Sequence, residues 1–403
     1  MRLGPRHTVA TPDLEQTVGA ILDRRLLRDR AAPIAVAFSG GGDSLALLLT
    51  ASAWAAAAGR RLLVLTVAHR LNPASAGWTR DCAAVAARLG ARFNALAWEG
   101  RKPAAGLPAA ARSARHALLA DTAREAGARA ILMGHTADDI AEARRMRATG
   151  STTPEPREWA PSPAWPQGRE VFLLRPLLTV RRQQIRAWLH ARGESWIEDP
   201  ANADLTYARS RARKALAGGA TDDALVSISP EDGVEIRVLA GSCRADGATG
   251  DLLVPRLAFR EATADARRRL VSIACLCAGG NDRPPRGRQI DHVAARLLAD
   301  ASFIATLAGA RIEADPHQVR IRREPGEVAR GGLAPLRLAA GATGVWDGRF
   351  EVSAQRAIEV VARPGATLPA VVREDGGFDD LDARPLAHDR LLAACGRIAC
   401  EPV

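Results

Sequence analysis

The residues with the clearest chemical potential form a glycine-rich turn, Ser39-Gly40-Gly41-Gly42-Asp43-Ser44. The turn follows a short apolar run and precedes a helical pattern. Consecutive glycines let the backbone bend tightly, so that several N–H groups point at one anion. The start of the helix adds the positive end of its dipole, and the hydroxyls of Ser39 and Ser44 can donate to phosphate oxygens. We therefore interpret the turn as a cradle for a pyrophosphate group.

Two known phosphate motifs do not fit this turn. It lacks the Gly-Lys-Ser/Thr ending of a Walker A loop, and its glycines are not spaced as in a dinucleotide fingerprint. Asp43 would repel a phosphate unless a cation bridged the two, so it predicts Mg²⁺ at the site. The alternative is a plain strand-to-helix turn in which Asp43 or Ser44 caps the helix.

A second polar stretch reads His135-Thr136-Ala137-Asp138-Asp139-Ile140-Ala141-Glu142. Asp138 and Glu142 are four residues apart, so they share one face of a helix. Two carboxylates near phosphates suit a metal ion or a cationic substrate amine, and His135 could contact a phosphate or act as acid or base. The alternative, of equal weight, is a helix start whose acids only satisfy the dipole.

Arginines supply the opposite charge. The candidate ligands for substrate anions are Arg112, Arg115, Arg175, Arg209 and Arg211. Arg112 and Arg115 lie three apart on a predicted helix, a fork that can grip a phosphate or a carboxylate. The last two belong to a basic stretch in which Tyr207 could stack on a nucleobase. Solvated helix faces explain these arginines equally well.

Strand-like and helix-like patterns alternate through the first half of the chain. Apolar runs typical of buried strands cover residues 34–38, 62–68, 92–98 and 130–133. Helical patterns followed by glycine cover residues 44–58, 75–89 and 107–126. The alternation predicts an α/β fold with a parallel sheet, helices on both faces and a ligand site at the carboxyl ends of the strands. The turn and the acids both follow strands, so we expect them at the same edge.

The rest of the chain carries weaker patterns. Prolines crowd residues 152–168, which we interpret as a loop or insertion. Further elements are predicted as a helix at 179–192, a strand at 234–239, helices at 257–278 and 289–298, and a hairpin at 310–323. We predict three domains, which cover residues 1–216, 217–305 and 306–403. The last could be a small α/β unit.

Composition sets broad limits on the protein. Of 403 residues 47% are hydrophobic, enough to bury sizeable cores. The net charge of +11 attracts polyanions, of which nucleic acid is the commonest, although a basic protein that binds none is an equal alternative. The six cysteines show no metal-site spacing, so we expect free thiols in a reducing compartment. We see no signal peptide or apolar run of about 18 residues, so we expect no membrane span and a cytoplasmic location.

Taken in order, these stretches resemble the tRNA(Ile)-lysidine synthetases, N-type ATP pyrophosphatases with a Ser-Gly-Gly-x-Asp-Ser signature. The similarity covers residues 34–214 and includes the stretches VAHRL at 67–71, ARSARH at 111–116, GHTADDIAE at 134–142, LLRPLL at 173–178 and IEDPANAD at 197–204. The resemblance implies a parallel-sheet, adenine nucleotide alpha-hydrolase-like catalytic domain. A mostly helical tRNA-binding region and a small C-terminal α/β unit would follow it.

The resemblance also implies a reaction and its cofactors, ATP and Mg²⁺. ATP adenylates the C2 oxygen of the first anticodon cytidine in a tRNA(Ile) that reads CAU, and pyrophosphate leaves. The amine of free L-lysine then attacks C2 and expels AMP, which gives lysidine. The sequence alone does not give the oligomeric state, and a homodimer is one alternative.

The implied roles fall on the residues already singled out. The ATP ligands are Ser39, Gly40, Gly41, Gly42, Asp43 and Ser44, with Asp43 on Mg²⁺. The catalytic residues are Asp43, Arg112, His135, Asp138 and Glu142. The lysine or tRNA ligands are Arg112, Arg115, Asp138, Glu142, Arg175, Arg209 and Arg211. Which of them bind lysine and which bind ATP is left open.

The chain departs from the family pattern at three single positions and in the Pro-rich insertion, which replaces the glycines and small residues usual beyond the acidic helix. Ala68, His116 and Ala143 stand where the family often has Asp, an aromatic residue and Thr. None is a predicted phosphate ligand, so the departures bear on the lysine and base pockets rather than on the ATP site.

Three other classes of protein are less consistent with the sequence. A tRNA thiolase on this fold needs a cysteine pair or a persulfide cysteine, and Cys82 is alone in the predicted catalytic domain. An amide-forming ATP pyrophosphatase needs an ammonia-producing partner region, and none is visible. A non-enzymatic RNA-binding protein would not need an intact glycine turn and paired acids.

We predict that tRNA affinity falls steeply as salt increases, because several arginines meet phosphates. Six such contacts would weaken binding by roughly 10³-fold between about 50 and 200 mM salt. Filter binding at stepped KCl concentrations measures the slope, and a flat response would contradict the polyanion interpretation.

Overall fold

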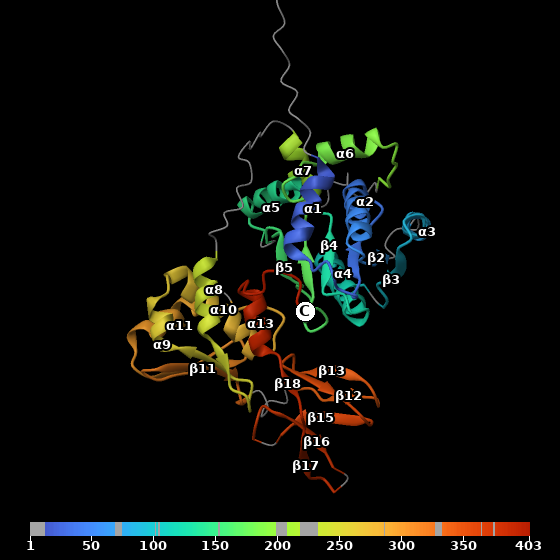
Figure 1. Cartoon of the computed structure of the whole chain (residues 1–403). Coiled ribbons are helices and arrows are strands. Elements are labelled where there is room, and N and C mark those ends of the chain that lie inside the picture. The colour runs from blue at the N-terminus through green and yellow to red at the C-terminus, as the bar shows by residue number, and fades with distance from the viewer. Residues whose placement is uncertain are drawn as a thin grey trace, which may run out of the picture. The chain divides into compact units, whose positions relative to one another are not determined.

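The computed structural model describes residues 13–68, 75–100, 102–103, 105–151, 154–198, 208–217, 233–285, 287–326, 333–363, 365–373 and 375–403. The chain forms two compact units (Figure 1). Unit 1 comprises Met1–Ile228 and Ala399–Val403, and unit 2 comprises Ser229–Ile398. The division into three domains stays a prediction about functional parts. No helix in the described ranges is long and apolar enough to cross a membrane.

Unit 1 is built on a six-stranded sheet with the order β3-β2-β1-β4-β6-β5. Its parallel strands are β1 (Ile34–Ala37), β2 (Leu62–Ala68), β3 (Arg92–Ala97), β4 (Ala130–Met133) and β6 (Phe172–Leu174). The short β5 (Trp159–Pro161) pairs antiparallel at the edge. The predicted parallel sheet is confirmed. The expected loop at 152–168 is wrong in part, because β5 lies within it and Trp159 stacks on Phe172.

Alternate residues of the central strands pack on opposite faces of this sheet. Ile34 and Val36 share a core with α1 (Leu14–Arg25), α2 (Gly42–Ala57), α3 (Ser75–Arg88) and α6 (Arg182–Ala191). Ala35 belongs to the core on the other face, under α4 (Leu107–Glu125). Strands covered on both faces must be apolar throughout, which is why they are continuous hydrophobic runs.

The residues Ala399–Val403 fold into unit 1 and bring a buried ion pair with them. Arg60 and Glu401 have fully buried side chains, and Arg60 Nη2 lies 3.0 Å from Glu401 Oε1. Glu401 Oε2 also accepts from the backbone N–H of Leu27 at 3.1 Å, and the Glu401 N–H donates to Arg25 O at 2.7 Å. This pair joins residues 341 positions apart, and no sequence pattern predicted it.

Unit 2 begins with helices packed on an antiparallel sheet. The helices are α8 (Val234–Ser242), α9 (Arg256–Glu261), α10 (Ala264–Ala278) and α11 (Gly287–Ala299), and the sheet order is β7-β8-β11-β10-β9. The hairpin predicted at 310–323 is confirmed as β10 (Ala310–Ala314) and β11 (Gln318–Arg323). The strand predicted at 234–239 is wrong. Those residues lie in α8, which buries Ile236, Leu239 and Ala240 at helical spacing.

The strand β9 (Phe303–Leu307) spans the predicted boundary at 305/306, so that boundary cuts a strand of this sheet. The later strands form a four-stranded sheet, β12-β15-β16-β17, and a three-stranded sheet, β13-β14-β18. The final helix, α13 (Ala387–Ala394), follows these strands, but its Ala387 and Leu391 pack in the core of the helices α8 and α10.

We predict that Glu401→Ala lowers the free energy of unfolding of unit 1 by about 3–5 kcal/mol, because it leaves the Arg60 guanidinium buried without a counter-ion. Urea denaturation followed by fluorescence measures the change. Glu194→Ala is the matched control, since its partner Arg88 is half-exposed and such pairs are worth about 1 kcal/mol or less. Equal losses in both variants would contradict a special role for the buried pair.

Candidate active site

The glycine turn connects β1 to the start of α2. The Ser44 Oγ donates to Gly41 O at 2.8 Å and accepts from the Ser39 N–H at 3.3 Å, so one hydroxyl pins both sides of the turn. Gly40 adopts a positive φ of 83°, and a Cβ there would lie 2.4 Å from Ile197 Cδ1. Both facts require glycine at this position.

The first residues of α2 keep their N–H groups available. The N-cap residue is Gly41, which has no side chain to cap the helix. The alternative in which Asp43 or Ser44 is the N-cap is therefore wrong. An α-helix begins with four N–H groups that lack helical partners, and an anion at this end would satisfy them. The local geometry supports a phosphate cradle.

The loop after β4 lies directly against this turn. A Cβ on Gly134 would lie 3.1 Å from both Cα and N of Ser44, so the two backbones are in contact. β1 and β4 are neighbours in the sheet and pair in parallel. The two polar clusters therefore meet at one sheet edge, as the sequence predicted.

The helix α5 (Ala137–Ala148) carries the predicted acids. Its N-cap is Thr136, and Asp139 Oδ2 accepts from the Thr136 N–H at 2.7 Å and from its hydroxyl at 2.9 Å. Asp139 thus forms a capping box with Thr136. For this one acid, the structural alternative, a role at the start of the helix, holds. Asp138 and Glu142 do not take part in the cap.

Arg182, which begins α6, binds the acids from both clusters. Its Nε donates to Asp43 Oδ2 at 2.9 Å, and its Nη1 donates to Glu142 Oε1 at 3.2 Å. Its backbone N–H donates to Asp138 Oδ2 at 2.7 Å, and its Nη2 lies 3.6 Å from Asp139 Oδ2. Sequence reasoning missed this residue, because nothing local separates it from the other arginines of the chain.

Glu142 is fully buried and saturated with arginines. Besides Arg182, it accepts from Arg209 Nε and Arg213 Nε, each at 2.8 Å. Burial raises the pKa of Glu142, but the hydrogen bonds from Arg213 and Arg209 outweigh it and hold the pKa below its usual range. The predicted Arg209 thus lies at the site on α7 (Ala208–Ala217), while Arg211 is exposed on that helix.

A cationic group lies beside these acids. Arg112 and Arg115 form no ion pair with any described carboxylate, and the Nε of Arg115 is buried without a hydrogen-bond partner. Burial, with Arg112 nearby, lowers the pKa of Arg115 to about 10. Burial likewise lowers the pKa of Arg175 to about 10. An uncompensated buried cation is costly, so the arrangement favours an anionic ligand.

His135 accepts a hydrogen bond from Arg175, whose Nε lies 3.0 Å from its Nδ1. Burial, together with Arg175 and Arg115, holds the pKa of His135 well below its usual range. The ring is therefore neutral at pH 7. Because its Nδ1 accepts from Arg175, the neutral ring carries its proton on Nε2 and can donate a hydrogen bond to a ligand, but it cannot serve as a protonated acid.

The predicted Mg²⁺ ligand Asp43 can be tested against this geometry. Within the described ranges, no group of three or more His, Cys, Asp or Glu side chains could hold a metal ion. Magnesium usually takes one or two carboxylates together with substrate phosphates and water. Asp43 lies in the first turn of α2, next to the cradle, and only its Oδ2 is bound by Arg182. It fits an ion shared with ATP.

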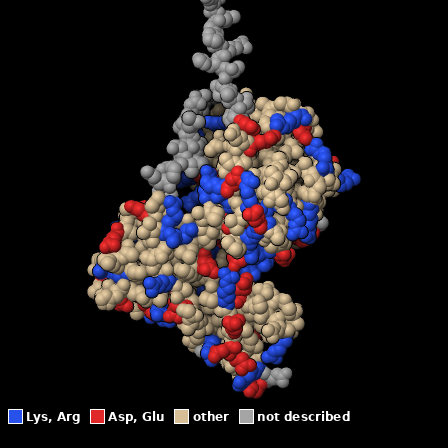
Figure 2. Space-filling model, in the orientation of Figure 1, with Lys and Arg blue, Asp and Glu red and all other residues tan. Residues whose placement is uncertain are grey.

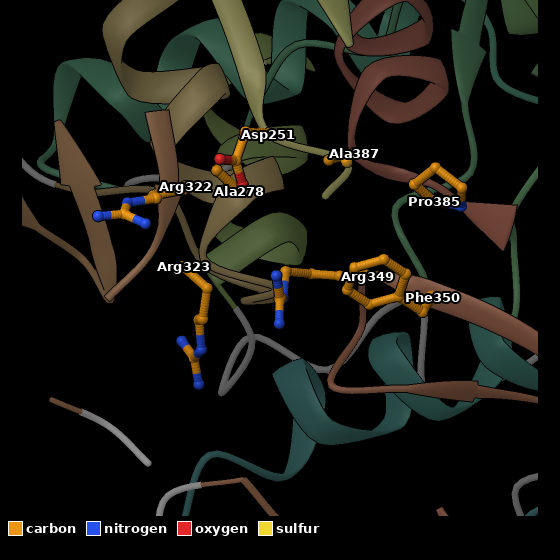
Figure 3. Close-up of a pocket in the computed structure, with 9 residues that line it drawn as sticks. Asp251, Ala278, Arg322, Arg323, Arg349, Phe350, Pro385 and Ala387 are labelled. Atoms are coloured by element: carbon orange, nitrogen blue, oxygen red, sulfur yellow. The ribbon is translucent and has the colours of Figure 1, made fainter. Parts of the chain in front are cut away.

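Several predicted residues lie outside the described residues. They are His69, Arg70, Leu71, the part of IEDPANAD from Asp199 onward, and Tyr207 with its proposed stacking role. The pocket in Figure 3 lies in unit 2, and none of the predicted site residues lines it. Its Arg323 and Arg349 are both paired with Asp347, so it offers no free cation comparable to Arg115.

The fold and this site define a class of protein. Unit 1 has a largely parallel sheet, and the glycine turn connects its first strand to the next helix. Residues 11–218 match the family described as the PP-loop domain. The chain is 52% identical over 359 residues to the tRNA(Ile)-lysidine synthase of Caulobacter vibrioides, covering 88% of this chain and 83% of that protein.

Two further relatives bear the same name. The tRNA(Ile)-lysidine synthase of Hyphomonas neptunium is 34% identical over 83% of this chain and 91% of its own length. That of Rhizobium meliloti is 33% identical over 85% of this chain and 79% of its own length. This chain belongs to the tRNA(Ile)-lysidine synthase family, which confirms the resemblance seen in its motifs.

We predict that His116→Phe stabilises the protein increasingly as the pH falls from 7 to 5. His116 is buried, and neither ring nitrogen has a hydrogen-bond partner. Burial, together with Arg115 and Arg112, lowers the pKa of His116 to about 2. The unfolded chain therefore binds a proton below about pH 6.5 that the folded chain refuses, and folding loses about 2 kcal/mol between pH 7 and 5.

The measurement is urea denaturation of wild type and variant at pH 7, 6 and 5. The difference between the two proteins should widen toward low pH. His292→Phe is the control on an exposed ring of α11 and should show no such trend. A constant difference between wild type and His116→Phe would show that His116 is protonated in the folded state.

Proposed function

We propose that this protein joins free L-lysine to C2 of the first anticodon cytidine of a CAU-reading tRNA(Ile), at the expense of ATP. The observation that carries the proposal is the contact between the glycine turn and the loop after β4, which brings acids to a phosphate cradle, while Arg112 and Arg115, without a carboxylate partner among the described residues, lie within electrostatic range of Asp139. The family membership supports the same reaction. A tRNA substrate assigns the activity to the cytoplasm.

In the first step, the C2 oxygen of the cytidine attacks the α-phosphorus of ATP, and the bond to pyrophosphate breaks. The N–H groups at the start of α2 and the hydroxyls of Ser39 and Ser44 would hold the leaving pyrophosphate. Bound Mg²⁺ would neutralise phosphate charge between ATP and Asp43. The described residues thus supply positioning and fixed charges, which suit phosphoryl chemistry.

In the second step, the lysine amine forms a bond to C2, the bond from C2 to the adenylated oxygen breaks, and AMP leaves. The amine also gives up a proton. Asp138 is the better ligand for an ammonium group, because only its Oδ2 is bound, by the Arg182 N–H. Glu142 already holds three arginines, so we assign it to the arrangement of the site.

The unpaired arginines fit the opposite end of the amino acid. Arg112 and Arg115 lie three apart on α4, and their lack of carboxylate partners suits an incoming carboxylate or phosphate. We propose that they hold the lysine carboxylate, with the ATP phosphates as the other ligand to be tested. On the face shown in Figure 2, Arg and Lys side chains lie among acids, and we propose that single arginines of this kind contact the tRNA phosphates.

The structure does not favour a thiolase. Cys82 is buried under the glycine turn, and burial raises the pKa of its thiol to about 11. A nucleophilic cysteine needs a low pKa and access to the substrate. The other cysteine in unit 1, Cys400, lies in the C-terminal residues.

We predict that the purified protein incorporates labelled lysine into one isoacceptor of total bacterial tRNA in the presence of ATP and Mg²⁺. Pyrophosphate release should require tRNA, and AMP release should require lysine as well. Gel separation of the tRNA and chromatography of the nucleotides measure these products. Pyrophosphate release that is stimulated by tRNA but yields no labelled tRNA would point to another modification.

Asp43→Asn is the matched variant for this assay. It keeps the size of the side chain but removes the charge that would share a cation with ATP. We expect it to abolish both pyrophosphate and AMP formation while tRNA binding stays at the wild-type level. Unchanged turnover in this variant would remove the argument for a metal ion at Asp43.

A further inference from the structure

One arginine connects the two acidic parts of the site. Asp43 belongs to the turn after β1, whereas Asp138, Asp139 and Glu142 belong to α5 after β4. Arg182 comes from a third element, α6; its guanidinium contacts Asp43, Asp139 and Glu142, and its backbone N–H contacts Asp138. Its side chain is only 17% exposed, so these contacts are made largely away from water.

The four acids depend on Arg182 to different degrees. Glu142 also binds Arg209 and Arg213, and Asp139 also binds Arg209 at 2.6 Å and the Thr136 cap. Asp43, in contrast, has no other ion pair within the described ranges. Loss of the Arg182 side chain would leave Asp139 and Glu142 paired with other arginines and would leave Asp43 alone beside like charges.

The shape of a guanidinium explains why this residue is an arginine. Its planar fork presents donors in several directions, and here Nε and Nη1 reach carboxylates on different elements. A lysine ammonium at the same place is a single point charge, which could bind one of these carboxylates but could not hold both in fixed positions.

We propose that Arg182 is a positioning residue for the adenylation step. It holds the Asp43 carboxylate at the phosphate cradle, at a fixed position relative to the acids of α5. The inference rests on the proposed function for the order of the two steps. Glu142 and Asp139 keep other partners, and Asp138, the proposed ammonium ligand, is bound by the backbone N–H of residue 182, which an alanine variant retains. The lysine step should therefore depend on the Arg182 side chain much less than the ATP step.

The test measures the two steps separately in the full chain. With excess enzyme, ATP and a CAU-anticodon tRNA but no lysine, the rate of pyrophosphate release reports adenylation. Lysine is then added to enzyme that has accumulated adenylated tRNA, and AMP release reports the second step. We expect Arg182→Ala to slow the first step by about 100-fold, the usual scale for a misplaced catalytic group, while the second changes by less than about threefold.

Arg186→Ala is the matched control, since it removes an arginine from an exposed position of the same helix, where it pairs with Glu198 at 3.4 Å. It should leave both steps at the wild-type rate. Arg182→Lys should recover part of the first step. If Arg182→Ala does not fold, the comparison is made with Arg182→Lys, whose first step should be slowed more than its second.

Two results would overturn the inference. One is a pyrophosphate rate in Arg182→Ala close to that of wild type, and the other is an equal loss in both steps, which a general structural role would give. Failure of the proposed function looks different. In that case, wild-type enzyme releases pyrophosphate but lysine releases no AMP, and the role of Arg182 is still measured by the first step.

Discussion

The site depends on one contact, between the backbone of the turn after β1 and the backbone of the loop after β4. Gly134 lies so close to Ser44 that any side chain would have to push the start of α2 away. The contact exists because β1 and β4 are parallel neighbours, with Ala35 opposite Ile131. A slip of one residue would exchange the two buried faces of the strand, so the hydrophobic core fixes the height at which the two loops meet.

Charge is organised around this contact in two parts. On one side, three carboxylates form ion pairs with Arg182, Arg209 and Arg213, which come from α6 and α7, and Asp138 accepts from the backbone N–H of Arg182. On the other side, Arg112 and Arg115 have no carboxylate partner among the described residues. The acids are thus held in place before any ligand binds, whereas Arg112 and Arg115 can still pair with an anionic ligand. Fixed charges of this kind cost no reorganisation during a reaction.

The sequence predicted what is local and missed what is distant. The turn at Ser39–Ser44, the acids of α5 and the strands β2 and β4 were predicted because each is a compact pattern of neighbours. The contact of Arg182 with Asp43 spans 139 positions, and nothing near Arg182 marks it among 56 basic residues. The strand predicted at 234–239 failed because its alternating apolar residues fit both periods, and packing on α10 selects the helix.

The arginines without carboxylate partners relate the stability of the empty site to its affinity for an anion. A buried guanidinium without a counter-ion costs free energy that the fold must supply elsewhere. An anion that reaches Arg115 recovers this free energy, so the same feature that weakens the empty site strengthens the filled one. Among the acids next to it, Asp139 and Glu142 are already paired with arginines and would repel that anion less than bare carboxylates would. A ligand that carries a carboxylate and an ammonium group matches both parts at once, whereas a simple cation or a simple anion matches one. For the lysine of the proposed reaction, the unpaired arginines would meet the carboxylate, and Asp138, which has no arginine side chain on it, would meet the ammonium group.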